Sequence, residues 1–256
     1  MNGIDVLNSK HFSLIFKSNF QLVMRQFINY SFLLLLIPLF LNTHKLQSQS
    51  MNYLALGDSY TIGEAVPAEQ NWPNVLAKQL QEDGFDIQRP KIIALTGWRT
   101  DELIDSIQSQ KKQLAKTYNL VSLLIGVNNQ YQKRDIGQYQ KEFEELLQIG
   151  LAKSKNGAES MFVVSIPDYG ISDFAKNKNL ENVAEEVAQY NQIAAEIAQK
   201  YHVPFYNITP VSKTTEGDTS MFAEDELHPS AKQYQLWLDV FYDEVKARME
   251  RLYSAE

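Results

Sequence analysis

The chain of 256 residues contains no cysteine and little glycine, proline or histidine. Without cysteine it has no disulfide framework, no thiolate zinc site and no thiol nucleophile. The 11 Gly and 8 Pro are too few for a collagen-like or low-complexity chain. Of the four histidines, His11 and His44 lie in the first fifty residues. Histidine-dependent chemistry in the rest of the chain therefore has two candidates, His202 and His228.

Acidic side chains outnumber basic ones beyond the first fifty residues. That segment holds four of the 24 Lys and Arg and one of the 31 Asp and Glu, which leaves 20 basic and 30 acidic side chains in residues 51–256. Binding to a phosphate backbone needs a positive surface that releases counterions, so this acidic balance predicts no nucleic-acid partner. The hydrophobic fraction of 44% is ample for the core of one domain.

The first fifty residues contain one short, dense apolar run. Residues 32–41 are apolar throughout, Arg25 precedes them and the polar segment 42–50 follows. A spanning helix needs about 20 apolar residues, so the run is short for a membrane span. The pattern is typical of a secretory signal peptide, and Met24 is a candidate start for translation. We therefore expect a leader over residues 1–50 and export to the periplasm or the cell exterior. An uncleaved anchor, through which alone the protein would contact a membrane, and a buried helix are the alternatives.

From residue 51 onward, short apolar runs alternate with longer segments of helical pattern. Each run is mostly apolar, as expected of parallel strands that helices cover on both faces. Strands that alternate with helices predict an α/β protein, a three-layer α/β/α sandwich around a five-stranded parallel sheet. Neither a repeat nor a linker divides residues 51–256, so we expect a single domain. The expected strands are 53–56, 92–95, 120–125, 161–166 and 205–208.

Helix start signals stand between these runs. Pro73 suits the first turn of a helix. Asp135 and Ser230 are each followed three residues later by glutamine, a spacing that resembles a capping box. A further helix is predicted by apolar residues that repeat at spacings of four and three, namely Val183, Val187, Tyr190, Ala194 and Ile197. These segments supply the helical layers of the sandwich.

The loops that follow the strands are where a ligand is expected, because the crevice of such a sheet lies outside the carboxyl ends of its strands. Ser59 follows the first strand at a glycine-containing turn, and His228 lies in the long loop after the fifth. Asp225 is close enough on a turn to reach the imidazole. A hydroxyl, a base and a carboxylate that orients the base are what nucleophilic ester cleavage needs. His202 is interpreted as structural or solvent-facing.

Two residues after other strands are candidates for binding an oxyanion. The backbone N–H of Gly97 and the side-chain amide of Asn128 can both point into the crevice. Donors aimed at the developing negative charge are each worth roughly 3–4 kcal/mol in the barrier. An α/β-hydrolase arrangement is disfavoured, because residues 57–61 lack the second glycine of a G-x-S-x-G turn.

With these residues in this order, the chain resembles the GDSL/SGNH hydrolase family over essentially all of residues 51–256. Two positions depart from the family pattern. Tyr60 stands where the family has leucine, and Asn129 stands where it usually has an aspartate that supports the site. The blocks that carry the resemblance are Gly57-Asp58-Ser59, Gly97, Gly126-x-Asn128 and Asp225-x-x-His228-Pro229.

The resemblance implies a flavodoxin-like sandwich and a metal-independent serine esterase that uses no cofactor. Ser59 would be the nucleophile and His228 the base, with Asp225 as the partner of the base. The oxyanion would be held by the N–H groups of Ser59 and Gly97 and by the Asn128 side chain. The substrate would be a small acyl ester, a lysophospholipid or an acetylated carbohydrate, and acyl transfer to an acceptor other than water stays open.

Aromatic side chains near these loops are candidates for the lining of an acyl or sugar pocket, with the protein core as the alternative. Arg99 is a candidate for binding an anionic group of the substrate, although a surface salt bridge is the simpler interpretation. The aromatic candidates are Trp98, Tyr131, Tyr169, Phe174 and Phe222.

Two interpretations from other functional classes remain. In a flavodoxin-like module that binds a phosphate or nucleotide, loop 59–63 would hold the phosphate on backbone N–H groups. Such a module has no use for His228 or Asp225. The other alternative is a catalytically inactive, surface-tethered interaction domain.

Overall fold

The computed structural model describes residues 50–253, so the expected leader lies outside the described residues except for residue 50. Five strands form one parallel sheet in the order β2-β1-β3-β4-β5, which confirms the predicted α/β fold. The strands are β1 (Tyr53–Gly57), β2 (Lys91–Ala94), β3 (Leu120–Leu124), β4 (Met161–Val164) and β5 (Phe205–Tyr206).

The strand order reverses next to β1. The chain passes from β1 to β2 on one side and then places β3 on the other side of β1. The register sets Gly57 at the end of β1 between Ala94 and Leu124. At such a switch point the connections after the two neighbouring strands lead to opposite faces of the sheet, and the crevice between them is where ligands bind.

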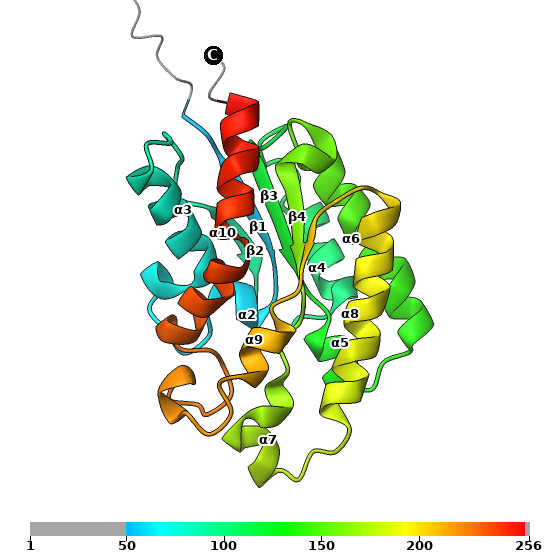
Figure 1. Ribbon diagram of the computed structural model, residues 1–256. Helices are drawn as coiled ribbons and strands as arrows, with labels where there is room; N and C mark the ends of the chain where they lie inside the picture. The colour runs from blue at the N-terminus through cyan, green and yellow to red at the C-terminus, as the bar shows by residue number, and fades with distance from the viewer. Residues whose placement is uncertain (1–49, 254–256) are drawn as a thin grey trace, which may run out of the picture. The chain divides into compact units, whose positions relative to one another are not determined.

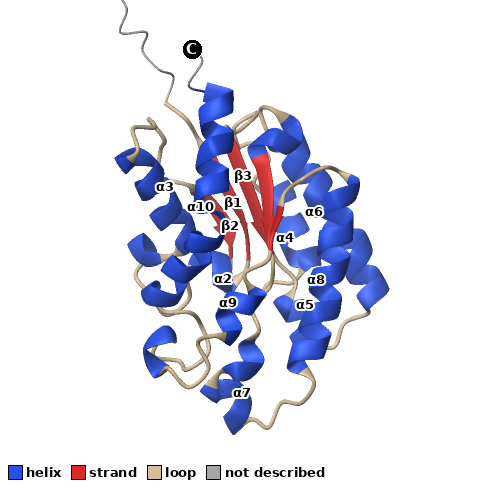
Figure 2. Ribbon diagram, viewed as in Figure 1, coloured by secondary structure: helices blue, strands red, loops and turns tan. Residues whose placement is uncertain are grey.

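Helices cover both faces of the sheet (Figures 1 and 2). On one face α3 packs against α10, and on the other α6 lies between α4 and α8. Trp72 of α3 lies edge-on to Phe162 and Phe241, with ring centroids 6.2 and 6.0 Å away, so aromatic packing joins this helical layer to the sheet. The long helices are α3 (Trp72–Glu82), α4 (Thr100–Ser109), α6 (Ile136–Lys153), α8 (Val183–Lys200) and α10 (Ala231–Tyr253).

Short helices gather beyond the carboxyl ends of the strands, at the lower end of the view in Figure 1. They are α2 (Ser59–Ile62), α5 (Val127–Tyr131), α7 (Asp173–Asn177) and α9 (Thr209–Lys213). Four 3₁₀ turns complete the described elements: η1 (Ala68–Gln70), η2 (Gly157–Ser160), η3 (Tyr169–Ile171) and η4 (Thr219–Met221). The strand-following loops that sequence patterning singled out thus meet at one end of the sheet.

Two strands end earlier than their apolar runs predict. The expected strand 161–166 stops at Val164, and 205–208 stops at Tyr206. Beyond those points, side chains replace the sheet ladder. Ile166 N–H donates to Asn191 Oδ1 (2.8 Å), and Ile208 N–H donates to Ser165 Oγ (2.9 Å). Backbone groups remain paired, although the strand pattern is lost.

Both predicted capping boxes form only in part. Asp135 Oδ1 accepts from the backbone N–H of Gln138 (2.7 Å), but the Gln138 side chain turns to Glu142 instead of back to the cap. Ser230 likewise accepts from the backbone N–H of Gln233 (3.4 Å), whose side chain donates to the carbonyl of Met221. The predicted apolar stripe of α8 is buried along its whole length.

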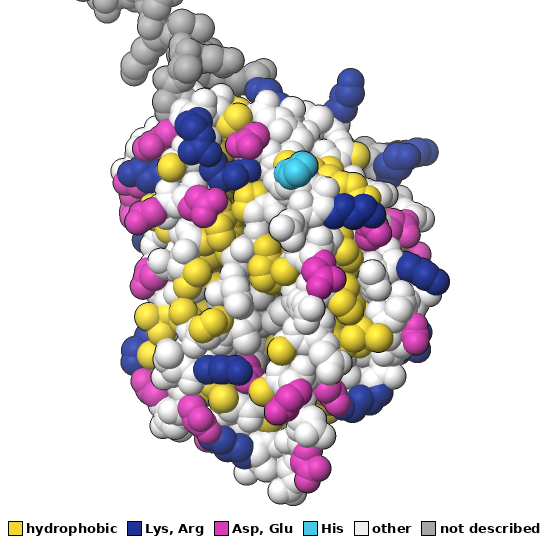
Figure 3. All heavy atoms as spheres, turned by 45° about the vertical axis from the view of Figure 1, so that its right-hand side comes forward, with side chains coloured by type: hydrophobic (Ala, Val, Ile, Leu, Met, Phe, Trp, Pro, Cys, Tyr) yellow, Lys and Arg dark blue, Asp and Glu magenta, His cyan; other side chains and the backbone are white. Residues whose placement is uncertain are grey.

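The described part of the chain shows no helix with the length and hydropathy of a membrane span. On the face in Figure 3, acidic and basic side chains are interspersed, with hydrophobic groups between them. That face therefore presents no extended field of one sign.

Candidate active site

Ser59 begins α2 directly beyond the end of β1. Gly57 allows this tight reversal, because a Cβ at that position would overlap both Thr61 Oγ1 and the carbonyl oxygen of Leu124. The short helix is thereby pressed against the ends of β1 and β3. Ser59 is 4% exposed, so its hydroxyl is sheltered from bulk water at the end of the sheet.

His228 and Asp225 form a pair within one turn of the loop before α10. The imidazole Nδ1 lies 2.5 Å from Asp225 Oδ2, while Oδ1 accepts from the backbone N–H groups of Leu227 (3.0 Å) and His228 (2.9 Å). Partial burial works to raise the pKa of Asp225, but these hydrogen bonds outweigh it and hold the pKa below its ordinary value. A carboxylate that accepts from Nδ1–H leaves Nε2 of the neutral imidazole as the basic nitrogen.

Tyr60 forms a wall beside the imidazole. Its ring lies edge-on to that of His228, with centroids 5.6 Å apart, and is almost fully buried. The carbonyl of Tyr60 accepts from the hydroxyl of Tyr234 on α10 (3.1 Å). The residue after Ser59 therefore ties α2 to α10 and restricts the orientations of the His228 ring.

A cavity of about 160 Å³ joins all five of the strand-following segments. Ser59 and His228 both line it, as do Gly97 and Asn128, so the structure brings together the nucleophile, base and oxyanion candidates that sequence spacing predicts. Its lining is mainly apolar apart from these groups. The complete lining is Ser59, Tyr60, Thr96, Gly97, Val127, Asn128, Tyr131, Tyr169, Phe174, Leu227 and His228.

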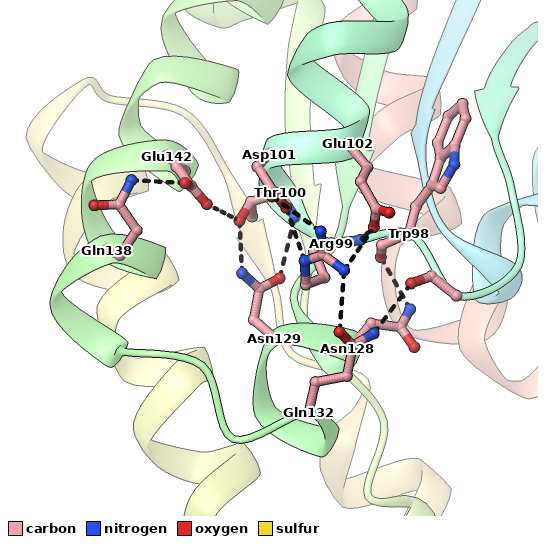
Figure 4. Close-up of polar contacts among 11 residues, drawn as sticks. Trp98, Arg99, Thr100, Asp101, Glu102, Asn128, Asn129, Gln132, Gln138 and Glu142 are labelled. Carbon is pink, nitrogen blue, oxygen red and sulfur yellow. Dashed lines mark hydrogen bonds and ion pairs between the residues drawn. The ribbon is translucent and has the colours of Figure 1, made fainter.

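Hydrogen-bond donors are available beside Ser59. Among residues 50–253, the backbone N–H groups of Ser59 and Gly97 have no hydrogen-bond acceptor. Gly97 has a φ of 85°, in the left-handed region, within a turn closed by a bond from Trp98 N–H to the carbonyl of Leu95 (3.2 Å). One hydrogen of Asn128 Nδ2 is donated to the carbonyl of Trp98 (2.9 Å; Figure 4), which leaves the second for a ligand.

Asp58 is a buried carboxyl immediately before Ser59. Its Oδ1 accepts from Tyr60 N–H (3.0 Å) and caps α2. Within the described chain, its Oδ2 is buried without a hydrogen-bond partner. Burial raises the pKa of Asp58 to about 7, against the opposing effect of the backbone N–H groups of Tyr60 and Gly126. Asp58 therefore keeps its proton at pH values where an exposed aspartate is ionised.

Three of the five aromatic candidates line the cavity. Tyr131, Tyr169 and Phe174 form part of its wall. Trp98 lies outside this lining and contributes only its backbone carbonyl, as the acceptor for Asn128. Phe222 also lies outside this lining, where it forms an isolated antiparallel bridge with Pro229.

Polar contacts fix this aromatic wall. The hydroxyl of Tyr169 donates to Gln130 Oε1 (2.7 Å), and burial raises the pKa of the phenol to about 12. The ammonium group of Lys178 lies 4.2 Å from the centroid of the Phe174 ring and 3.5 Å from the hydroxyl of Tyr131. A hydrogen bond to Gln130 thus fixes Tyr169, and the Lys178 ammonium group contacts Phe174 and Tyr131.

Sequence reasoning missed four residues of the lining, namely Tyr60, Thr96, Val127 and Leu227. Each is the chain neighbour of a predicted site residue, and that adjacency is the signal that could have found them. On a short turn, the chain neighbour of a motif residue lies close to the same cavity and can contribute to its lining.

The remaining polar candidates lie outside the cavity. Arg99 pairs with Asp101 (3.0 Å) and Glu102 (3.3 Å), in agreement with its interpretation as a salt bridge. His202 is exposed in the turn after α8 and has a φ of 57°. Across residues 50–253, His, Asp and Glu side chains form no cluster of three or more that could hold a metal ion.

Comparison with protein families shows to which family the chain is related. Residues 55–236, which include all of the candidate catalytic residues, match the GDSL-like Lipase/Acylhydrolase family. The chain belongs to this family. It shows no significant sequence match to a curated protein.

Solved structures of GDSL esterases and acylhydrolases share the fold. TesA superposes with a TM-score of 0.60 at 15% identity, covering 77% of this chain and 99% of its own. A lipase/acylhydrolase from Enterococcus faecalis gives 0.59 at 18%, with 77% and 97% covered. Axe2, an acetylxylan esterase from Geobacillus stearothermophilus, gives 0.59 at 16%, with 77% and 95% covered. At these identities the likeness concerns the fold alone.

Proposed function

We propose that this GDSL-family protein hydrolyses carboxylic esters through an acyl-enzyme on Ser59. The observation that carries the proposal is the 2.5 Å contact between Asp225 and His228 on the cavity that Ser59 also lines. A carboxylate–imidazole pair whose imidazole borders the same cavity as a sheltered hydroxyl supplies the groups needed to activate a serine. A phosphate-binding module would not need this pair.

The proposed reaction uses His228 twice. As Ser59 Oγ attacks the ester carbonyl, Nε2 of His228 takes the hydroxyl proton, and Asp225 stabilises the imidazolium through Nδ1–H. The imidazolium then protonates the leaving alcohol. Water, activated by the same nitrogen, attacks the acyl-enzyme and releases the acid, which restores the Ser59 hydroxyl.

The negative charge of each tetrahedral intermediate falls on the former carbonyl oxygen. We assign its stabilisation to the N–H groups of Ser59 and Gly97 and to the second Nδ2 hydrogen of Asn128. These donors are free in the described chain and border the same cavity. Removing one such donor typically costs about 100- to 1,000-fold in turnover.

The proposed substrate is a small acyl ester, such as an acetylated carbohydrate. Pockets for drug-sized ligands run from about 300 to 1,000 Å³. The cavity here is about 160 Å³, which suits a short acyl group more than a long lipid chain. Axe2, one of the proteins with this fold, is named as an acetylxylan esterase. Residues 1–50 remain, as a proposal, an export leader or membrane anchor.

A fluorophosphonate probe tests the proposed nucleophile. We expect the purified protein to be labelled once, with the adduct on Ser59, and Ser59→Ala to abolish both labelling and hydrolysis of p-nitrophenyl acetate. Ser109→Ala is the matched control, because Ser109 is exposed at the end of α4. EDTA should leave the rate unchanged. An unlabelled protein that hydrolyses no ester but binds a flavin or nucleotide phosphate would favour the binding module.

A further inference from the structure

Two neighbouring amides on α5 hold the backbone of the loop that carries Gly97. Asn128 Nδ2 donates to the carbonyl of Trp98 (2.9 Å), and Asn129 Oδ1 accepts from the N–H of Thr100 (3.1 Å; Figure 4). The two bonds fall on either side of Arg99. They fix the loop to α5, and therefore fix Gly97 relative to Asn128.

The orientation of the Asn129 amide is settled by its partners. Because the backbone N–H of Thr100 can only donate, Oδ1 must face it, and Nδ2 then donates to Thr100 Oγ1 (2.7 Å). The Thr100 hydroxyl in turn donates a hydrogen bond to Glu142 Oε2 (2.5 Å). The other oxygen, Oε1, accepts from Gln138 Nε2 (2.6 Å). Every donor in this series of hydrogen bonds thus has one acceptor.

Asn129 and Glu142 complement each other at the Thr100 hydroxyl, because one donates to it and the other accepts from it. Thr100 is fully buried and Asn129 is 2% exposed, so unpaired groups at this point are costly. An aspartate at position 129 would present a second carboxylate to the Thr100 hydroxyl, which has only one proton to give. The amide at this position instead donates to the Thr100 hydroxyl, which leaves the single hydroxyl proton for the carboxylate of Glu142.

We propose that Asn129, Thr100 and Glu142 are positioning residues for the oxyanion site, and that Asn129 is required by the charge of Glu142. This inference rests on the proposed function. The three residues do not line the cavity. They anchor the loop of Gly97 to α5 and α6, and in this way keep the Gly97 N–H and the Asn128 amide aimed at one point.

The test reverses the direction of these hydrogen bonds. In Asn129→Asp, two carboxylates compete for one hydroxyl proton, and we expect kcat for p-nitrophenyl acetate to fall at least about tenfold with little change in KM. The melting temperature should fall by about 5 °C or more. In the double variant Asn129→Asp/Glu142→Gln, the glutamine donates to the Thr100 hydroxyl, which in turn donates to the carboxylate introduced at position 129. Both kcat and melting temperature should recover most of the loss.

The controls separate this inference from general effects of charge. Glu142→Gln alone should be mild, because the glutamine oxygen still accepts from Thr100. Gln140→Glu adds the same charge at an exposed position of α6 and should change neither quantity. Equal losses in Asn129→Asp and in the double variant would overturn the pairing, and a recovered melting temperature without recovered kcat would overturn the positioning role. A wild-type protein inactive on every ester overturns the proposed function, and with it the oxyanion role.

Discussion

Asp58 places a titratable group in a buried site beside the candidate nucleophile. Its pKa is raised from 3.8 to about 7 because burial penalises the charged form. Between these values the folded protein keeps a proton that the unfolded chain releases. The free energy of unfolding therefore falls as pH rises from about 4 to 7, by up to about 1.4 kcal/mol per unit from this group.

Replacement of Asp58 by asparagine should remove this dependence. The amide has the shape of the neutral carboxyl, and its oxygen can still accept from Tyr60 N–H. Relative to wild type, we expect Asp58→Asn to gain stability steadily from pH 4 to 7, by at most about 4 kcal/mol, and to gain nothing further above pH 7. Urea unfolding at each pH measures this difference. Parallel curves for the two proteins would show that Asp58 titrates normally.

At the scale of residues, the sequence predicts which side chains come together at the site better than it predicts their hydrogen-bond partners. Ser59, His228, Gly97 and Asn128 follow different strands, and the parallel sheet brings such positions to one edge. Their catalytic roles remain predictions. The partners of Asn129 could not be foreseen, because they depend on where α6 places Glu142, thirteen positions along the chain.

At the scale of elements, the placement of α5 depends on one glycine. Gly126 has a φ of 127°, and a Cβ there would lie 2.7 Å from Cε2 of Tyr139 on α6 and 3.2 Å from Cδ1 of Ile166. The absent side chain lets the start of α5 settle against α6. Asn128 is two residues further on, so its direction is set by this contact.

The variant Gly126→Ala should lose both stability and turnover. Backbone strain and overlap with a buried ring are expected to cost about 2–4 kcal/mol in the free energy of unfolding, and kcat should fall because α5 shifts. Gly84→Ala is the control for strain alone, since Gly84 has a φ of 97° with no atom within 4 Å of its added Cβ. Denaturant unfolding and ester kinetics measure the two effects. A loss no larger than that of the control would refute the role given to the overlap.

The start of each expected strand agrees with the structure to within one residue, but two strand ends do not agree. Ile166 and Ile208 stand two positions beyond Val164 and Tyr206, so local pattern alone extends both strands. The actual ends are set by Asn191 and Ser165, which capture the backbone from other parts of the fold. Hydrogen bonds of this kind join residues far apart in sequence and leave no local periodicity.

At the scale of the whole molecule, the cavity is built from segments that are remote in sequence. Ser59, Gly97, Asn128, Phe174 and His228 come from five different parts of the chain. Its volume therefore depends on the order of the strands and the packing of several loops. A local sequence pattern specifies neither the strand order nor the loop packing. The sequence therefore predicted the polar groups of the site but not the size of its pocket.

The cavity volume predicts the preferred acyl length. In a series of p-nitrophenyl esters, we expect kcat/KM to be highest for acetate to butyrate and at least about tenfold lower for octanoate, because added methylenes meet the aromatic wall. Phe174→Ala should shift the optimum to longer chains, whereas Phe222→Ala, outside the lining, should not. A wild-type optimum at octanoate or beyond would contradict this account.

The pair of His228 and Asp225 belongs to a different part of the fold from the nucleophile it is proposed to serve. Ser59 is attached to β1, whose five residues are all buried, whereas most of residues 214–227 are exposed. Local opening of that loop costs less free energy than opening of the sheet. Heat or denaturant would therefore disconnect the base from the serine while the sheet is still folded, and inactivation would precede global unfolding.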